Sequence, residues 1–334
     1  MPGFVALGTR LLRPQQEAVS FRAYTERPQG QFMNTSEMTA KIAAGKGFIA
    51  ALDQSGGSTP RALKGYGIED DAWSNDEEMF GLIHDMRARI ITSPAFTGEK
   101  VIGAILFERT MDGQVDGKPT PQALMDRGVV PFIKIDKGLE DEADGVQMMK
   151  PIPGLDKLLA KAKGLGVFGT KERSVINSAN AKGIAAIVRQ QVEVGQQVLA
   201  SGLVPMLEPE INIKSPDRAD SDQIMLNELI TQLSAMPGTE KVMLKLSLPV
   251  KPGLFDPLVN HPRVLRVVAL SGGYNRPDAC AELAKNRGIV ASFSRALLED
   301  LRFQMSDDEF DASLASAIDD IYRGSTQKIA TATA

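Results

Sequence analysis

Short apolar runs alternate with longer amphipathic segments along the chain from residue 46 onward. Eight of the short runs have the length and composition of buried strands. They are residues 47–53, 101–107, 130–136, 169–176, 203–210, 242–248, 264–271 and 289–294. Between them lie segments with apolar residues at helical spacing, such as 182–200 and 223–235. Eight strands alternating with helices predict a closed (β/α)8 TIM barrel in a single α/β domain, with an open doubly wound sheet as the second possibility.

Helix start and stop signals agree with this alternation. Pro277 lies where the first turn of a helix is expected, and Gly288 follows as a stop signal. Ser306 and Glu309 have the spacing of a capping box ahead of the last amphipathic segment. The helices are therefore predicted between the strands and after the eighth one.

The chain divides into three parts by composition. Residues 1–32 contain four arginines and no lysine, and they show little apolar periodicity. We expect this part to be a disordered leader, or to result from a misassigned translation start before Met33; organelle targeting by the leader stays open. Residues 33–325 contain no repeat or linker and form the predicted barrel, and residues 326–334 are expected to be a flexible C-terminal tail.

Composition narrows the function classes. The 334 residues are 43% hydrophobic and 24% charged with a formal net charge of -4, which is typical of a globular protein without a nucleic-acid surface. The single cysteine, Cys280, allows no intrachain disulfide, which favours the reducing cytoplasm. No apolar run approaches the roughly 18 residues of a membrane span. His84 and His261 are far apart and predict no metal site, and the sequence is compatible with a homo-oligomer.

The barrel hypothesis requires that functional side chains gather at the carboxyl ends of the strands. Each predicted strand ends in charged residues, serine or glycine. In strand order these residues are Asp53, Glu108, Lys134 with Asp136, Lys171 with Arg173, Glu208 with Glu210, Lys245, Ser271 with Gly272 and Gly273, and Ser294 with Arg295. Members of the three charged doublets are two residues apart, so each pair lies on one face of its strand. These residues are the candidate site.

Lys245 is the most informative of them. In the run 242–248, strand alternation places Lys245 on the same face as Met243 and Ser247, among residues of a packed interior. An unpaired buried ammonium is costly. One interpretation is a structural ion pair or a lysine that reaches solvent at the strand end, and the other is an amine nucleophile.

Schiff-base catalysis requires an amine, an acid/base for dehydration of the carbinolamine and a nearby positive charge. Lys245, Glu208 and Lys171 can fill these roles on neighbouring strands. Asp53, on the first strand, can accept a hydroxyl proton and so promote carbon–carbon cleavage. The alternative for Glu208 and Glu210 is a purely structural role in neutralising nearby lysines.

The loops after the seventh and eighth strands predict a phosphate site. Loops at these positions commonly bind phosphate in this fold, and Ser271-Gly272-Gly273 and Ser294-Arg295 supply backbone N–H groups and a guanidinium. A second anion can bind at Arg173 or Lys171. These two anion sites together predict a phosphorylated substrate.

Segments at all eight strands resemble class I fructose-bisphosphate aldolase, and the bacterial branch of that family most closely. The resemblance rests on GFIAALDQSGGSTP (47–60), SPAFTGEK (93–100), VPFIKIDKG (130–138), GTKERSVI (169–176), GLVPMLEPE (202–210), VMLKLSLP (242–249), ALSGGY (269–274) and ASFSRAL (291–297). It implies reversible cleavage of fructose 1,6-bisphosphate to dihydroxyacetone phosphate and glyceraldehyde 3-phosphate, in glycolysis or gluconeogenesis, without a cofactor or metal.

The resemblance also implies residue roles. Lys245 would be the Schiff-base lysine, Glu208 the acid/base, Glu210 its charged neighbour and Lys171 the group that tunes the lysine. Asp53 would handle the C4 hydroxyl and Lys134 would orient substrate hydroxyls. Phosphate contacts would come from Arg173 on the distal side and from Ser271, Gly272, Gly273, Ser294 and Arg295 on the ketone side. Unlike the animal enzymes, the chain does not end in tyrosine, so no residue is assigned to proton exchange on the enamine.

Three other functions are compatible with a barrel of this kind. A metal-dependent aldolase requires clustered histidines, which this chain lacks. Another Schiff-base aldolase, acting on a sugar monophosphate, would share Lys245 without needing both Arg173 and Arg295. A non-catalytic barrel would be expected to have lost Lys245, Glu208 or Asp53.

Overall fold

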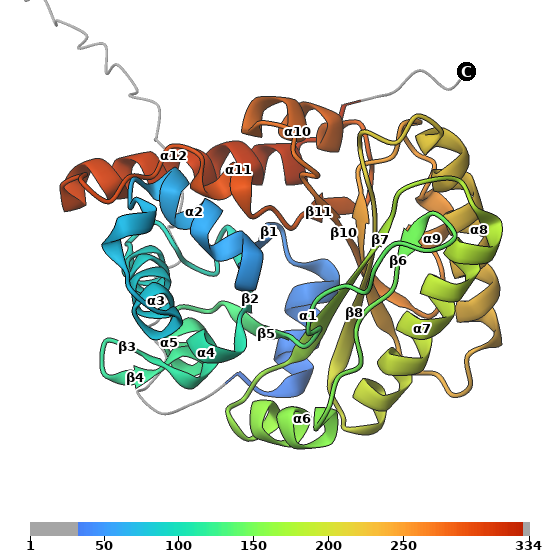
Figure 1. Ribbon diagram of the computed structural model, residues 1–334, viewed down its shortest axis with the longest axis horizontal. Helices are drawn as coiled ribbons and strands as arrows, with labels where there is room; N and C mark the ends of the chain where they lie inside the picture. Colours follow the sequence, from blue (N-terminus) through green and yellow to red (C-terminus); the bar gives the residue numbers. More distant parts are fainter. Residues whose placement is uncertain (1–32, 330–334) are drawn as a thin grey trace, which may run out of the picture. The chain divides into compact units, whose positions relative to one another are not determined.

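Eight parallel strands form the centre of the computed structural model, which describes residues 33–329 (Figure 1). In sheet order they are β1 (Phe48–Leu52), β2 (Val101–Leu106), β5 (Val130–Lys134), β7 (Gly169–Ile176), β8 (Val204–Ile211), β9 (Val242–Ser247), β10 (Val264–Leu270) and β11 (Ile289–Ala291). Each one matches a predicted strand. Within the described residues, β6 (Val146–Gln147) adds an antiparallel edge to β7, and β3 (Gln114–Val115) pairs with β4 (Lys118–Pro119).

The first and last strands meet, which makes the sheet a nearly closed barrel. The Ala51 N–H, in β1, donates to the Phe293 carbonyl just after β11, with N and O 3.1 Å apart. The predicted TIM barrel is confirmed, and the open doubly wound sheet is wrong. β11 ends three residues earlier than predicted because the chain turns after Ala291, where the Ser292 N–H still donates to Ala269 O at 2.7 Å.

Helices alternate with the strands. They are α1 (Thr35–Ala44), α2 (Thr59–Tyr66), α3 (Asp76–Thr92), α4 (Glu108–Asp112), α5 (Thr120–Asp126), α6 (Leu155–Gly164), α7 (Ala181–Ala200), α8 (Arg218–Ala235), α9 (Asp256–Val259), α10 (Arg276–Ala284), α11 (Arg295–Leu298) and α12 (Asp307–Thr326), with 3-10 turns η1 (Gly56–Ser58) and η2 (Asp70–Ala72). Figure 1 shows α7 and α8 covering one side of the barrel. The predicted capping box of Ser306 and Glu309 is present at α12.

The two faces of each strand belong to different cores, as β9 illustrates. Val242, Leu244 and Leu246 pack outward with the helices in one apolar cluster, whereas Met243 belongs to a second cluster inside the barrel. Ile42 of α1 also belongs to the inner cluster, so α1 helps to fill the end of the barrel where the strands begin. The apolar filling gives way to charged side chains toward the carboxyl ends, where Lys245 follows Met243 on the same face.

The whole predicted leader, residues 1–32, and residues 330–334 of the predicted tail lie outside the described residues. The last described residues contact the barrel, since the Ile329 N–H donates to Ala284 O at 3.0 Å and Lys328 Nζ donates to three backbone carbonyls. The domain boundaries stay a prediction. Among residues 33–329, no helix has both the length and the apolar character needed to cross a membrane.

Candidate active site

Strand register brings the charged doublets to the same level inside the barrel. Lys134 of β5 is aligned with Lys171 of β7, and Arg173 of β7 is aligned with Glu208 of β8. Parallel strands in register keep alternate side chains on one face, so the charged groups of neighbouring strands converge there. The spacing of two residues within each doublet is therefore what concentrates the charges.

Lys171 is at the centre of this cluster. Its side chain is buried, and its Nζ lies 2.7 Å from Asp53 Oδ2, 2.9 Å from Glu208 Oε2 and 3.9 Å from Asp136 Oδ2. Burial by itself would lower the pKa of Lys171, but the three carboxylates raise it well above its usual value. Lys171 is thus a fixed positive charge in the reaction chamber.

Glu208 is shared between Lys171 and Lys245. Its Oε1 lies 3.0 Å from Lys245 Nζ, while its Oε2 contacts Lys171, and both lysine side chains are at most 5% exposed. Burial raises the pKa of Glu208, but the two lysine charges outweigh this effect and lower it. The carboxylate is therefore ionised and in direct contact with the Lys245 amine.

Asp53 and Lys134 complete the buried cluster. Burial raises the pKa of Asp53, yet Lys171 and Lys245 together hold it far below its usual value. Lys134 Nζ donates to Asp136 Oδ1 at 2.5 Å, and burial lowers the pKa of Lys134 despite this carboxylate. Asp53 is thus a carboxylate able to accept a proton, and Lys134 is a donor anchored by Asp136.

The buried cluster is formally neutral. It contains three lysines, namely Lys134, Lys171 and Lys245, and three carboxylates, namely Asp53, Asp136 and Glu208. Arg173 and Glu210 beside it form a further neutral pair, with Nε and Oε2 2.5 Å apart. A doubly phosphorylated substrate therefore needs additional positive charge elsewhere in the site.

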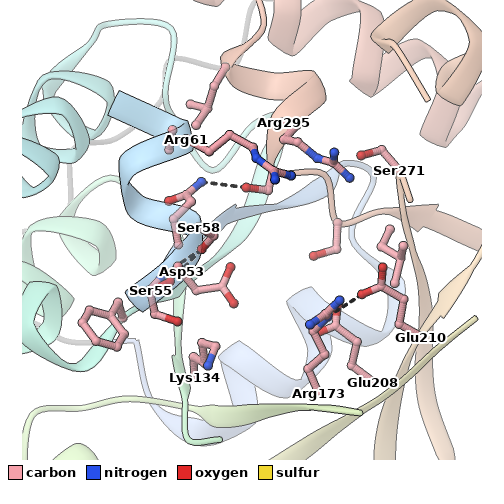
Figure 2. Close-up of a pocket in the computed structure, with 18 of the residues that line it drawn as sticks. Asp53, Ser55, Ser58, Arg61, Lys134, Arg173, Glu208, Glu210, Ser271 and Arg295 are labelled. Carbon is pink, nitrogen blue, oxygen red and sulfur yellow. Dashed lines mark hydrogen bonds and ion pairs between the residues drawn. The ribbon is translucent and has the colours of Figure 1, made fainter. Parts of the chain in front are cut away.

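Additional positive charge is present in the cavity that contains this cluster, which has a volume of about 1170 Å3. Arg61 of α2 and Arg295 of α11 line it with exposed guanidinium groups, and neither has an ion-pair partner within residues 33–329. Figure 2 shows Arg61, Arg295 and Ser271 on one side of the opening and Lys134 and Arg173 on the other. The cavity thus has the guanidinium groups of Arg61 and Arg295 on one side, and Lys134 and Arg173, each paired with a carboxylate, on the other.

The glycine loop after β10 is close to Arg295. Gly272 and Gly273 have φ values of +60° and +111°, which residues other than glycine rarely adopt. A Cβ added to Gly273 would lie 3.4 Å from Arg295 Nη2, and one on Gly272 would lie 2.7 Å from Ile213 Cγ2. The two glycines therefore allow the loop to turn tightly beside the guanidinium.

Every residue with a predicted role lines this one cavity, whereas Glu108, at the start of α4, does not line it and pairs with Lys137 and Lys161. The residues with a predicted role are Asp53, Lys134, Lys171, Arg173, Glu208, Glu210, Lys245, Ser271, Gly272, Gly273, Ser294 and Arg295. Their individual roles stay predictions. Residues without a predicted role also line it: Gln54, Ser55, Ser58, Arg61, Arg109, Asp136 and Lys137.

The sequence contains a signal for some of the cavity residues for which no role was predicted. Ser55-Gly-Gly-Ser58 follows the first strand just as Ser271-Gly-Gly follows the seventh, and the same phosphate argument applied to it would have pointed to Ser55 and Ser58. Arg61 follows three residues later, on α2. Nothing in the local sequence of Arg109 or Lys137 distinguishes them from surface residues.

Comparison with known proteins agrees with this geometry. The family model described as "Glycolytic", fructose-bisphosphate aldolase class-I, matches residues 34–254. A fructose-bisphosphate aldolase class 1 of Porphyromonas gingivalis is 53% identical over 290 residues, which cover 86% of this chain and 98% of the relative. A crystal structure of Plasmodium falciparum fructose-bisphosphate aldolase, at 18% identity, superposes with a TM-score of 0.72 over 89% of this chain and 95% of the other. The chain belongs to the class I fructose-bisphosphate aldolase family, the metal-independent lyases that form a Schiff base while reversibly cleaving fructose 1,6-bisphosphate.

Proposed function

We propose that Lys245 forms the imine with the substrate ketone, that Glu208 exchanges protons during imine formation and that Asp53 promotes carbon–carbon cleavage. The observation that most strongly supports these roles is the contact of 3.0 Å between Lys245 Nζ and Glu208 Oε1 inside the barrel. It pairs an amine with an acid/base at hydrogen-bond distance, as imine chemistry requires. The family identity supplies the reaction, and the geometry supports the roles.

Imine formation needs two proton movements at Lys245. The ammonium first passes a proton to Glu208, and the free amine then attacks C2 of the open-chain ketose to give a carbinolamine. Glu208 returns a proton to the carbinolamine hydroxyl, which leaves as water while the C2–N double bond forms. Lys171 holds Glu208 through its other oxygen, so Oε1 keeps facing Lys245.

Cleavage of the C3–C4 bond requires removal of the proton from the C4 hydroxyl. Asp53 is ionised and accepts that proton, the C4 oxygen becomes the aldehyde of glyceraldehyde 3-phosphate, and the bonding electrons move into an enamine conjugated with the Lys245 nitrogen. Protonation at C3 and hydrolysis of the imine release dihydroxyacetone phosphate. The positive charge of Lys171, 2.7 Å from Asp53 Oδ2, holds this carboxylate in place.

The two phosphates bind on opposite sides of the reactive cluster in this proposal. Arg295, Ser294 and the loop from Ser271 to Gly273 hold the ketone-side phosphate, because they combine unpaired positive charge with a tight turn. Arg173 meets the distal phosphate, in competition with its partner Glu210. Lys134 orients substrate hydroxyls from the position where Asp136 anchors it.

The test is reduction of the imine with borohydride in the presence of dihydroxyacetone phosphate, followed by peptide mass spectrometry. We expect the added mass on Lys245. Modification of Lys171 or Lys134 in its place would overturn the assignment, because all three lysines line the same cavity. In parallel, the wild-type enzyme should prefer fructose 1,6-bisphosphate over fructose 1-phosphate in kcat/KM, whereas a strong preference for the monophosphate would contradict the two-phosphate arrangement.

The state of assembly and location of the protein are also proposals. We propose a homo-oligomer in the cytoplasm, since the family acts on soluble sugar phosphates and the single cysteine suits a reducing compartment. Light scattering of the purified protein tests the assembly, with a mass of one chain as the contradicting result. Fractionation of the source cells tests the location.

A further inference from the structure

Arg87 is a fully buried arginine behind the active site. It lies on α3, its exposure is 0%, and within residues 33–329 no carboxylate approaches its guanidinium closely enough to form an ion pair. Burial lowers the pKa of Arg87 to about 10, so the group still carries its charge at pH 7. A buried charge without an opposite partner is costly, and an apolar side chain would fill the space without that cost. Its presence calls for a role other than packing.

All the partners of Arg87 are neutral oxygens near the catalytic residues. Nη2 donates to the backbone carbonyl of Gln54 at 2.5 Å and to its side-chain Oε1 at 3.0 Å, and Nη1 donates to Thr110 Oγ1 at 2.6 Å. Gln54 directly follows Asp53 in the loop after β1. The guanidinium therefore holds both the main chain and the side chain of the residue next to the proposed base.

The contact with Arg87 also fixes which end of the Gln54 amide faces the substrate side. Because Oε1 accepts from Arg87, the amide nitrogen points the other way, where Nε2 donates to Ser294 Oγ at 2.6 Å and to Ala51 O at 3.3 Å. Ser294 directly precedes Arg295 in the loop after β11. Arg87, Gln54 and Ser294 thus form a continuous hydrogen-bond chain from α3 to the phosphate loop.

This hydrogen-bond chain connects the loops after β1 and β11, the two neighbouring strands of the barrel with the fewest backbone hydrogen bonds between them. β1 and β11 share no paired ladder in the described residues, and the Ala51–Phe293 hydrogen bond joins them. The other neighbouring strands of the barrel share paired ladders, from two aligned residue pairs between β8 and β9 to eight between β7 and β8. Side chains therefore have to set the relative position of the Asp53 loop and the Ser294–Arg295 loop.

We propose that Arg87 is a positioning residue that, through Gln54, holds Ser294 and Arg295 in register with Asp53. This inference rests on the proposed roles of Asp53 and Arg295. When the ketone-side phosphate binds at Arg295, the hydrogen-bond chain keeps the reacting carbons aligned with Asp53. The charge of Arg87 also favours the ionised form of Asp53, since the attraction between the two groups is mutual.

The test compares Arg87→Met with Ser294→Ala and with the double variant. We expect each single variant to raise the KM for fructose 1,6-bisphosphate, Arg87→Met by about tenfold, as is typical for losing hydrogen bonds from a charged group. The double variant should be no worse than the poorer single variant, because both substitutions break the same chain. In Arg87→Met the KM should change more than kcat, because the phosphate contact at Arg295 is displaced while Lys245 and Glu208 keep their contact.

Arg266→Met is the matched control. Arg266, on β10, is partly buried, and among residues 33–329 its side chain donates to two backbone carbonyls, Ala43 O at 2.7 Å and Gly45 O at 3.5 Å, at the other end of the barrel. This variant should lose thermal stability yet keep the wild-type KM. Arg87→Lys retains the charge but cannot reach all three acceptors, so it should also raise KM. It supplies the same measurement if Arg87→Met does not fold.

Two results would overturn the inference. One is a folded Arg87→Met enzyme with wild-type KM, and the other is strict additivity of its effect with that of Ser294→Ala. Borohydride trapping distinguishes these failures from failure of the proposed roles. If the wild-type enzyme is trapped at Lys245 while Arg87→Met behaves like the wild type, only the inference about Arg87 falls.

Discussion

Glu208 and Lys245 face each other from adjacent strands inside the barrel, with Oε1 and Nζ 3.0 Å apart. The second oxygen of Glu208 contacts Lys171, so a single carboxylate joins the proposed nucleophile to a permanent positive charge. This arrangement gives Glu208 and Lys171 different tasks, although both are buried and charged. Glu208 exchanges protons with the amine, and Lys171 holds Glu208 and Asp53.

Replacing Glu208 tests its proposed role in proton exchange. Glu208→Gln keeps the size of the side chain but cannot take a proton from Lys245, so imine formation should slow by a factor of about 10² to 10⁴. Single-turnover trapping with borohydride and dihydroxyacetone phosphate measures that rate. An unchanged trapping rate in Glu208→Gln would assign the proton exchange to another group.

Lys245→Met should abolish covalent trapping and lower kcat by a factor of at least about 10³, because no other side chain can take over the imine. The fold should survive, since Glu208 keeps its contact with Lys171. The exposed Lys157, on α6, provides a control: Lys157→Met should trap as the wild type does. Trapping that persisted at full strength in Lys245→Met would show that another lysine is the nucleophile.

Arg295→Ala should act on binding more than on chemistry. Loss of an unpaired guanidinium at the phosphate site should raise the KM for fructose 1,6-bisphosphate by about 10- to 100-fold, with a smaller change in kcat. Steady-state kinetics measure both quantities. Arg287→Ala removes an exposed arginine that does not line the cavity and should change neither. An unchanged KM in Arg295→Ala would place the phosphate elsewhere.

The ionisation of Asp222 should make the stability of the fold depend on pH. Burial raises its pKa from 3.8 to about 6, against the hydrogen bond from Val250 N–H and the charge of Arg218. The folded protein therefore binds a proton here more tightly than the unfolded chain does, and wild-type stability is reduced as the pH rises through 4 to 6. Asp222→Asn keeps an acceptor for Val250 and should raise the free energy of unfolding at pH 7 by roughly 2 to 3 kcal/mol.

Urea denaturation at pH 7 and at pH 4 measures this effect, which should be nearly absent at pH 4. The control is Asp220→Asn, because Asp220 is exposed on the same helix, α8. A stabilisation by Asp222→Asn that is equal at both pH values would show that the ionisation of Asp222 is not its cause.

Incubation with a strong chelator should leave the activity unchanged, because the imine on Lys245 provides the electron sink that a metal ion would otherwise supply. Initial rates of fructose 1,6-bisphosphate cleavage before and after dialysis against EDTA test this. Loss of activity that zinc restores would contradict the Schiff-base mechanism.

The barrel and the main candidate residues could be predicted because their signals are local. Strand alternation is a property of the backbone, so the position of Lys245 relative to Met243 is readable from the run 242–248. β11 was predicted three residues too long because Ser292, Phe293 and Ser294 continue the polar and apolar alternation of a strand past the last residue paired with β10. Ser292 and Phe293 are buried although they lie in the loop after the strand.

By itself, the sequence determined the order of strands and helices, the face of each strand on which a charge lies and the gathering of charges at the carboxyl ends. These follow from periodicity and from the direction of parallel strands. Only the tertiary structure decided which charges touch: that Lys171 pairs with Asp53, that Arg61 and Arg295 have no ion-pair partner among residues 33–329, and that Arg87 is buried behind Asp53. Gln54 and Ser294 are 240 residues apart in the chain, and closure of the barrel brings them within hydrogen-bond distance, which no local pattern encodes.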